Sequence, residues 1–294
     1  MFSKVINIIK LGRMEHGLLA AITVVASYYV SGGRNGYVAL TLLASTFFAE
    51  VFLFVTNDIH NINEDRVNRP NAPLVTGVIS FREAYWLALA SLVLSLIQVI
   101  PVAIGWANSL SLIILLVALI LGYLYNSRLK RVMIINNLIV ALVTSLTYLY
   151  GLTSVKVIMP KSSLFMTLLF LTTVVATLGR EIVKGSLDYE GDLRVNIRTV
   201  ATVYGRDAAN RVGSIVMLIA VALSIPLMIT SLMVLGEFSP LFMLLVALTD
   251  SLILFLSIRI IKGDLRWFRE LSLLAMGLTL IGLMLCSLLI FIYA

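Results

Sequence analysis

The chain has 294 residues, of which 60% are hydrophobic and 13% are charged, and its mean hydropathy is +1.04. Soluble domains carry about 25% charged residues, so this composition excludes a water-soluble globular protein. The net charge of +7 accompanies long apolar segments, so it favours contact with anionic lipid, and we expect no nucleic-acid partner. Two histidines and a single cysteine, Cys286, exclude a disulfide within the chain and a Cys/His metal site.

Nine apolar segments of the chain are long enough to cross a membrane, since about 20 helical residues span the ~30 Å of hydrocarbon. Backbone polar groups find no water inside a bilayer, so these segments are expected to be helices. We therefore predict an all-α, polytopic membrane protein of about nine transmembrane helices in one domain, residues 1–294. The segments lie near residues 17–31, 38–56, 84–102, 109–126, 133–151, 163–180, 212–233, 238–258 and 270–293.

Basic residues are divided unequally between the connections of these segments. Of the 22 Lys and Arg residues, 19 precede the first segment or lie in alternate connections. The other side carries Arg34, Lys156 and Lys161. Cytoplasmic loops carry an excess of Lys and Arg, so we predict a multi-pass protein of the cell membrane with a cytoplasmic amino terminus and an outside carboxyl terminus.

Polar and acidic residues gather at the end of the second apolar segment. This first cluster comprises Asn57, Asp58, His60, Asn61, Glu64, Asp65, Asn68 and Arg69. If the helix continues past the membrane, positions 58, 61 and 65 share one face, because residues three and four apart are neighbours. The first cluster is therefore expected to present a row of oxygen atoms at the membrane surface.

A second cluster follows the sixth apolar segment, on the same predicted side. It comprises Arg180, Glu181, Lys184, Asp188, Glu190, Asp192 and Arg194. Mg²⁺ is held in proteins by a few carboxylates together with substrate phosphates, and Arg and Lys bind phosphate oxygens. We therefore predict a site for a magnesium-bound diphosphate whose hydrocarbon part lies between apolar helices. Solvated charges that mark helix ends are the alternative interpretation.

These clusters resemble the two signatures of the UbiA-type intramembrane prenyltransferases. The family's N-D-x-x-D-x-x-x-D motif is similar to NDIHNINEDRVNRPNAPLVTGVIS, and its D-x-x-x-D motif is similar to GREIVKGSLDYEGDLRVNIRTVATVYG. Arg13 with the pair Glu15–His16, and the run YNSRLKRVMIINNLIVALVTSLTYLYG, also look familial. The likeness spans about residues 10–206 and is strongest to the archaeal digeranylgeranylglyceryl phosphate synthases.

The resemblance implies a helical bundle around a central cavity that opens to the cytoplasmic side. The implied reaction is Mg²⁺-dependent transfer of a prenyl group, geranylgeranyl in the synthases, from its diphosphate to geranylgeranylglyceryl phosphate. The allylic C–O bond of the donor ionises, and the acceptor captures the carbocation. Besides the donor, the lipophilic acceptor and the lipid bilayer, no obligate protein partner is expected.

The resemblance also assigns roles to residues by motif position. The implied metal ligands are Asn57, Asp58, Asn61 and Asp65 in one row and Asp188 and Asp192 in the other. The implied catalytic residues are Asp58, Asp65, Asp188, Asp192 and Lys184. The implied substrate-binding residues are Arg13, Asn68, Arg69, Lys130, Tyr125 and Tyr148. The two tyrosines would turn their ring faces to the cation, or they serve only packing.

Two positions depart from the family pattern. Asn61 stands where the family has Asp, and Ala72 stands where it has Arg. Asn61 keeps a carbonyl oxygen for Mg²⁺ but lacks a charge, and Glu64, one turn later, is the expected substitute.

Other classes of function remain open. A prenyltransferase that acts on an aromatic acceptor such as hydroxybenzoate would share the metal site and differ only in its acceptor pocket. A membrane transporter would place ionisable residues and broken helices near the middle of the bilayer. Here Glu50, Asp250 and few others lie within spans, and the acidic clusters lie at helix ends. Glu50, seven residues before Asn57, lies on the same helical face, so it is either part of the site or a polar contact between helices. A non-catalytic scaffold does not account for the paired motifs.

Overall fold

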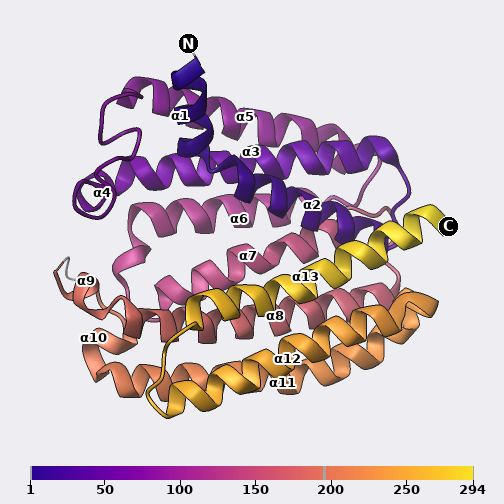
Figure 1. The fold of residues 1–294 in the computed structure, drawn as a ribbon. Coiled ribbons are helices and arrows are strands. Elements are labelled where there is room, and N and C mark those ends of the chain that lie inside the picture. Colours follow the sequence, from indigo (N-terminus) through magenta and orange to yellow (C-terminus); the bar gives the residue numbers. More distant parts are fainter. Residues whose placement is uncertain (1, 195–196, 294) are drawn as a thin grey trace.

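The computed structural model describes residues 2–194 and 197–293, which form helices and no strands (Figure 1). Nine of the described helices have 17 residues or more. Each coincides with one predicted apolar segment, so the all-α prediction is confirmed. They are α2 (Met14–Val30), α3 (Gly36–His60), α5 (Phe81–Gly105), α6 (Leu110–Ser127), α7 (Ile135–Thr153), α8 (Pro160–Leu187), α11 (Arg206–Leu235), α12 (Ser239–Ile261) and α13 (Phe268–Tyr293).

Seven stretches of the described chain are long and apolar enough to cross a membrane. One of them, Arg206–Ile261, contains both α11 and α12, whereas α2 is shorter than the others. Large apolar side chains also point outward, as with Ile104 at 82% exposure and Leu40 at 68%. Lipid is the solvent that suits such a surface, so the chain is a multi-pass membrane protein.

Local signals determine where several helices begin. At the start of α5, Ser80 and Glu83 form a capping box, in which each side chain accepts a hydrogen bond from the other residue's backbone. The Asn35 side chain accepts backbone hydrogen bonds from the first turn of α3. Pro160 occupies the first turn of α8, where its missing N–H costs nothing.

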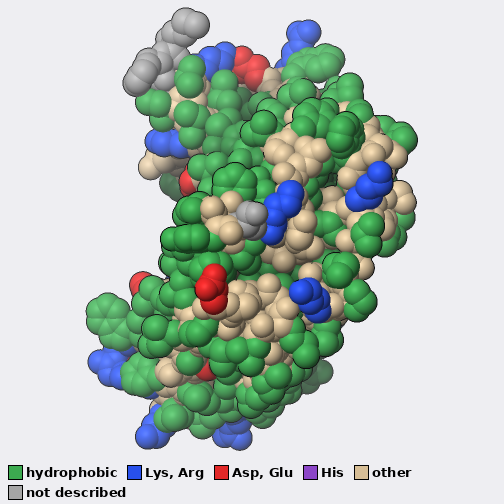
Figure 2. Space-filling view, turned by 90° about the vertical axis from the view of Figure 1, so that its right-hand side faces the viewer, with side chains coloured by type: hydrophobic (Ala, Val, Ile, Leu, Met, Phe, Trp, Pro, Cys, Tyr) green, Lys and Arg blue, Asp and Glu red, His purple; other side chains and the backbone are tan. Residues whose placement is uncertain are grey.

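Short helices gather at one end of the bundle, drawn on the left of Figure 1. We call this the polar end and define it by α4 (Ile62–Asn68), η1 (Leu129–Arg131), α9 (Tyr189–Arg194), α10 (Val200–Tyr204) and the connection 262–267. The basic connections that were predicted to share one side therefore lie at one end. The opposite end carries η2 (Gly236–Phe238), and Figure 2, viewed from that end, shows mostly hydrophobic and uncharged side chains.

The amino-terminal lead is helical, which the sequence analysis did not predict. The helix α1 (Phe2–Gly12) packs on α3 near one end of the bundle and runs across it (Figure 1). It ends at Arg13, whose φ of 43° is left-handed. A non-glycine residue in this conformation is strained and is commonly found at functional sites.

The long helices form a closed ring in the order α2, α3, α6, α7, α8, α11, α12 and α13, and α5 packs outside α3. The helices α2 and α7 also touch across the ring at Gly151, where a Cβ atom would lie 2.5 Å from the Val24 carbonyl oxygen. The helices α8 and α11 approach as closely at Gly213, whose added Cβ would lie 2.8 Å from the Gly179 carbonyl oxygen. Small residues permit such approaches in membrane bundles. The contact between α2 and α7 divides the interior into two compartments away from the polar end.

Candidate active site

The first cluster lies where α3 passes into α4. The helix breaks at Asn61, so the expected continuous helix is wrong at this residue; asparagine side chains compete for backbone hydrogen bonds and favour helix ends. The spacing nevertheless survives the break. The backbone N–H of Asn61 donates to Asn57, and that of Asp65 donates to Asn61, both at 2.9 Å. Positions 57, 61 and 65 therefore still stack one turn apart.

The second cluster lies where α8 passes into α9. Asp188 is the C-cap of α8, so it belongs to the end of a long helix and not to a separate segment beyond it. The backbone N–H of Asp192 donates to the Asp188 carbonyl oxygen at 2.9 Å. The two carboxylates are thus one helical turn apart, as predicted from their spacing.

Asp58 is the most deeply buried carboxylate of the first cluster, with 1% of its surface exposed. Its Oδ1 atom accepts hydrogen bonds from Arg13 and Arg69, each at 3.1 Å. The guanidinium of Arg13 also lies over the Phe54 ring, 4.8 Å from its centre. The Oδ2 atom of Asp58 is buried and accepts no hydrogen bond from the described residues.

Asp65 lies beside Asp58 and has Arg69 3.7 Å away. Burial, followed by the charge of Asp58, raises the pKa of Asp65. The amide of Asn57 donates to Asn126 at 2.8 Å, so its carbonyl oxygen stays available. Asn126 lies in the run YNSRLKRVMIINNLIVALVTSLTYLYG, and its contact with Asn57 was not predicted.

Glu64 is held by basic residues of η1. Lys130 donates to its Oε2 atom at 2.5 Å, and Arg131 lies 3.5 Å from its Oε1 atom. The sequence led us to expect Glu64 to substitute for the charge that Asn61 lacks. Glu64 is instead engaged in these ion pairs and does not supply a free carboxylate beside Asn61. The amide nitrogen of Asn61 is buried and has no hydrogen-bond partner among the described residues.

In the second cluster, Asp188 pairs with Arg269 of α13, a residue to which the sequence analysis assigned no role. Asp192 is partly buried, and this burial, followed by the charge of Asp188, raises the pKa of Asp192 to about 6. Lys184 and Lys130 oppose this rise of the pKa. Asn57 and Lys130 line the same cavity as Glu181 and Lys184, so the two clusters face one another across the polar end.

A cavity of about 520 Å³ separates the clusters, and we call it the site cavity. Its polar lining residues are Arg13, His16, Glu50, Asn57, Tyr125, Asn126, Lys130, Thr144, Glu181 and Lys184. Glu181 is paired with Arg180 at 2.8 Å and with Lys184 at 2.6 Å. The cavity wall therefore combines basic side chains at the polar end with apolar helix faces farther in.

A second chamber of about 370 Å³ lies among α7, α8, α11, α12 and α13. It shares Val140, Thr144 and Glu181 with the site cavity, and its walls are mainly apolar. The structure places Tyr148 in this chamber and Tyr125 in the site cavity, so the two predicted tyrosines lie in different compartments. Asn68 and Arg69 line a surface depression at the polar end together with Arg13.

The donor set at the polar end fits Mg²⁺. Asp58 lies beside Asp65, and Asp188 lies beside Asp192; in each pair the first charge raises the pKa of the second residue. Such like-charged pairs are stabilised by a cation. Within the described ranges, no three Asp, Glu, His or Cys side chains are grouped closely enough to hold a metal ion. Mg²⁺ would therefore need further oxygens from a ligand, as it commonly takes from phosphates.

A membrane-embedded helical ring with two facing acidic motifs above an apolar cavity defines an intramembrane transferase of prenyl groups. Residues 18–267 match the UbiA prenyltransferase family, and the chain belongs to this family. The protein is therefore an enzyme, a membrane prenyltransferase.

Two relatives are digeranylgeranylglyceryl phosphate synthases. The synthase of Methanococcus aeolicus is 33% identical over 208 residues, which cover 68% of this chain and 69% of the relative. The synthase of Archaeoglobus fulgidus is 30% identical over 279 residues, which cover 92% of this chain and 91% of the relative.

Solved structures share the fold. A structure of digeranylgeranylglyceryl phosphate synthase in membranes has a TM-score of 0.79 and 25% identity, and the match covers 97% of this chain and 99% of that one. A UbiA homologue from Archaeoglobus fulgidus, bound to DMAPP and Mg²⁺, has a TM-score of 0.75 and 20% identity, with 97% and 99% coverage.

Proposed function

We propose that this enzyme transfers a geranylgeranyl group from geranylgeranyl diphosphate to the free glycerol hydroxyl of geranylgeranylglyceryl phosphate, in archaeal ether-lipid synthesis. The observation that carries the proposal is the pair of acidic clusters that face one another over a largely apolar interior. The relatives named digeranylgeranylglyceryl phosphate synthase, one of them aligned over 92% of the chain, support this choice of acceptor.

The polar end would bind the diphosphate of the donor. Metal ligands would be Asn57, Asp58, Asn61 and Asp65 in the first cluster and Asp188 and Asp192 in the second. Bound Mg²⁺ would neutralise the diphosphate and stabilise it as a leaving group. Phosphate oxygens would be gripped by Arg13, Asn68, Arg69, Lys130 and Lys184, because charge-assisted hydrogen bonds to phosphate are strong.

The apolar interior would hold the hydrocarbon part of the substrates. The second chamber joins the site cavity at Val140, Thr144 and Glu181, so an isoprenoid chain can extend from the polar end into it. Tyr125 would turn its ring face, which carries negative quadrupole charge, to the allylic cation in the site cavity, and Tyr148 would contact the isoprenoid chain in the second chamber. Walls of this kind would also keep water from the cation.

The topology proposed with this function has nine spans in a single domain, a cytoplasmic amino terminus and an outside carboxyl terminus. It requires α2, α11 and α12 each to cross the membrane. The gathering of basic connections at the polar end supports this orientation. Reporter fusions at the two ends should report opposite sides of the membrane, and a finding of both ends on one side would contradict nine spans.

The acceptor is tested by offering two acceptors to the purified protein in liposomes. Radiolabelled geranylgeranyl diphosphate and Mg²⁺ would be supplied with geranylgeranylglyceryl phosphate and, in parallel, with hydroxybenzoate. We expect label in a lipid that carries two isoprenoid chains. Label in prenylated hydroxybenzoate alone would assign the aromatic acceptor, and movement of unreacted donor across the membrane without diphosphate release would indicate a transporter.

A further inference from the structure

Glu50 is a carboxylic acid inside a membrane helix, and the two acidic clusters do not include it. It lies on α3, seven residues before Asn57, which places it about 10 Å deeper along the helix axis at 1.5 Å per residue. It lines the site cavity together with Lys130 and Lys184. Ionisable residues inside membrane helices are costly, and they commonly mark functional sites.

Glu50 differs from the other carboxylate in the wall of the site cavity. Glu181 is paired with Arg180 and Lys184, and Lys130 is taken by Glu64. No hydrogen bond or ion pair from the described residues engages the Glu50 carboxyl group. Glu50 is thus the acid of this wall that is free to exchange a proton with a molecule in the cavity.

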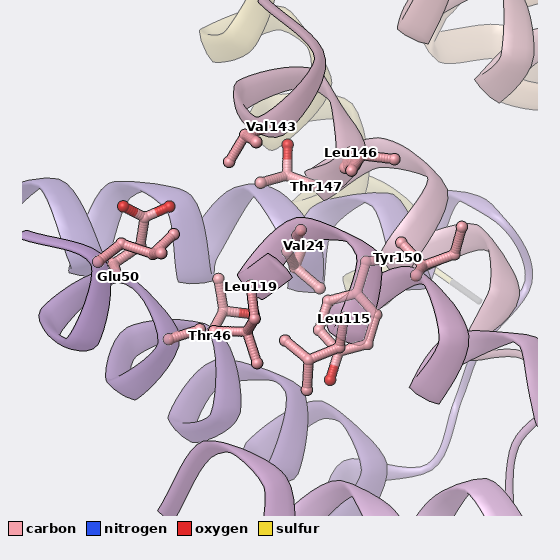
Figure 3. Close-up of a pocket in the computed structure, with 13 residues that line it drawn as sticks. Val24, Thr46, Glu50, Leu115, Leu119, Val143, Leu146, Thr147 and Tyr150 are labelled. Carbon is pink, nitrogen blue, oxygen red and sulfur yellow. The ribbon is translucent and has the colours of Figure 1, made fainter. Parts of the chain in front are cut away.

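A small void lies next to Glu50, on the side away from the polar end. It has a volume of about 30 Å³ and is lined by residues of α2, α3, α6 and α7. Figure 3 shows Glu50 and Thr46 of α3 among the residues that line this void, together with Leu119 of α6 and Val143 of α7. The Thr46 hydroxyl, one turn before Glu50, is buried and has no hydrogen-bond partner among the described residues.

The void and its two polar groups have the size and the chemistry to hold a water molecule. A water molecule needs about 10–15 Å³ of such space and two or more polar partners, and Thr46 and Glu50 supply these partners. A water held between them would hydrogen-bond the carboxyl group from behind and fix its orientation toward the site cavity. Buried polar atoms are rarely left unsatisfied, so this arrangement accounts for the unpartnered Thr46 hydroxyl as well.

Resting on the proposed function, we propose that Glu50 is a catalytic residue, the base that accepts the hydroxyl proton of the prenyl acceptor. The C1–O bond to the diphosphate breaks, and its electron pair leaves with the diphosphate. A lone pair of the acceptor oxygen forms the new C1–O bond, which leaves a proton on a positively charged oxygen. That proton passes to the Glu50 carboxylate, and the ether product is neutral at this oxygen.

The test compares Glu50→Gln with the wild type in liposomes with Mg²⁺, and with Glu237→Gln, an exposed residue at the opposite end, as the matched control. Transfer to the acceptor should fall about 100-fold or more in Glu50→Gln, the scale of a lost general base. Hydrolysis of the donor without acceptor should stay within about twofold of the wild type. With Mg²⁺ kept saturating at every pH, so that protonation of Asp192 does not limit the rate, the decline of wild-type kcat at low pH should disappear in Glu50→Gln and persist in the control.

Three results would overturn the proposal: transfer at the wild-type rate, an equal loss of donor hydrolysis, or an acid decline at saturating Mg²⁺ that persists in Glu50→Gln. Thr46→Val tests the void separately. It keeps the carboxylate but removes a hydrogen bond to its charged form, so the acid decline should move to higher pH; an unmoved decline would contradict the role of the void.

If the wild type uses a different acceptor, the proposed function fails, and the same comparison with that acceptor still decides the role of Glu50.

Discussion

Asp192→Asn should separate stability from function. Asp192 is partly buried next to Asp188, and no ion pair with the described residues compensates its charge. Burial and the neighbouring charge raise the pKa of Asp192 from 3.8 to about 6, so the metal-free folded protein resists its ionisation. If Asp192 binds a cation, Asp192→Asn should remove this destabilisation of the metal-free protein and abolish metal-dependent turnover.

The magnitude follows from the pKa. Raising the pKa of Asp192 from 3.8 to about 6 corresponds to about 3 kcal/mol, at about 1.4 kcal/mol per pH unit. Solvent reaches part of the side chain, and screening reduces the usable value to about 1 kcal/mol. Because the folded state binds the proton more tightly, this destabilisation is absent below pH 3.8 and complete above about pH 6. Asp192→Asn should therefore raise the melting temperature in EDTA by about 2 °C at pH 7.5, and the gain should vanish toward pH 4.

The assay combines melting and turnover of the purified protein. Mg²⁺ and prenyl diphosphate should raise the melting temperature of the wild type through binding, and this rise should largely disappear in Asp192→Asn. Turnover should fall about 100-fold or more, since several kcal/mol of charge stabilisation depend on the metal. Asp207→Asn, at an exposed position outside the cluster, should change both quantities little. A variant that melts several degrees below the wild type in EDTA, or that keeps wild-type turnover, would refute this reasoning.

The other predictions concern the metal. EDTA should abolish prenyl transfer and Mg²⁺ should restore it, because carboxylates alone repel a diphosphate; undiminished turnover in chelator would remove the metal from the account. Asn61→Asp should be tolerated and should tighten Mg²⁺ binding in a titration, since it adds a charge to the first cluster, and a large loss of turnover would show that the site requires the neutral side chain. Mg²⁺ binds the ionised form of Asp192, whose pKa is about 6, and below that pH it must displace a proton. Mg²⁺ affinity should therefore fall up to about tenfold per pH unit below pH 6, and Asp192→Asn should lack this dependence.

The helices could be predicted because each apolar segment is long and the membrane leaves its backbone no alternative to helical hydrogen bonding. The gathering of basic connections at one end also follows from the sequence, through the alternation of charge along the chain. The helix α1 was not predicted, because Lys4 and Lys10 interrupt its apolar residues and the segment resembles a polar stretch before the first span. The break at Asn61 was missed because spacing alone does not distinguish a continuous helix from one with a single non-helical residue.

Within the site, the acidic motifs are local in sequence, so their positions could be predicted. Their partners are not local. Asn126 bonds Asn57 across 69 residues, and Arg269 pairs with Asp188 across 81 residues. Such contacts depend on which helices are neighbours in the ring, and a single sequence does not encode that order in any local pattern. The pairing of Glu64 with Lys130 was missed for the same reason.

The central claim is that the two acidic clusters together hold one metal-bound diphosphate. Crystals grown with Mn²⁺ and a non-reactive thiolo analogue of geranylgeranyl diphosphate would test it through the anomalous scattering of manganese. We expect manganese beside the row from Asn57 to Asp65 and beside Asp188 and Asp192, with the diphosphate between them and the isoprenoid chain in the apolar interior. Manganese at one cluster only, or a diphosphate bound away from both clusters, would contradict it.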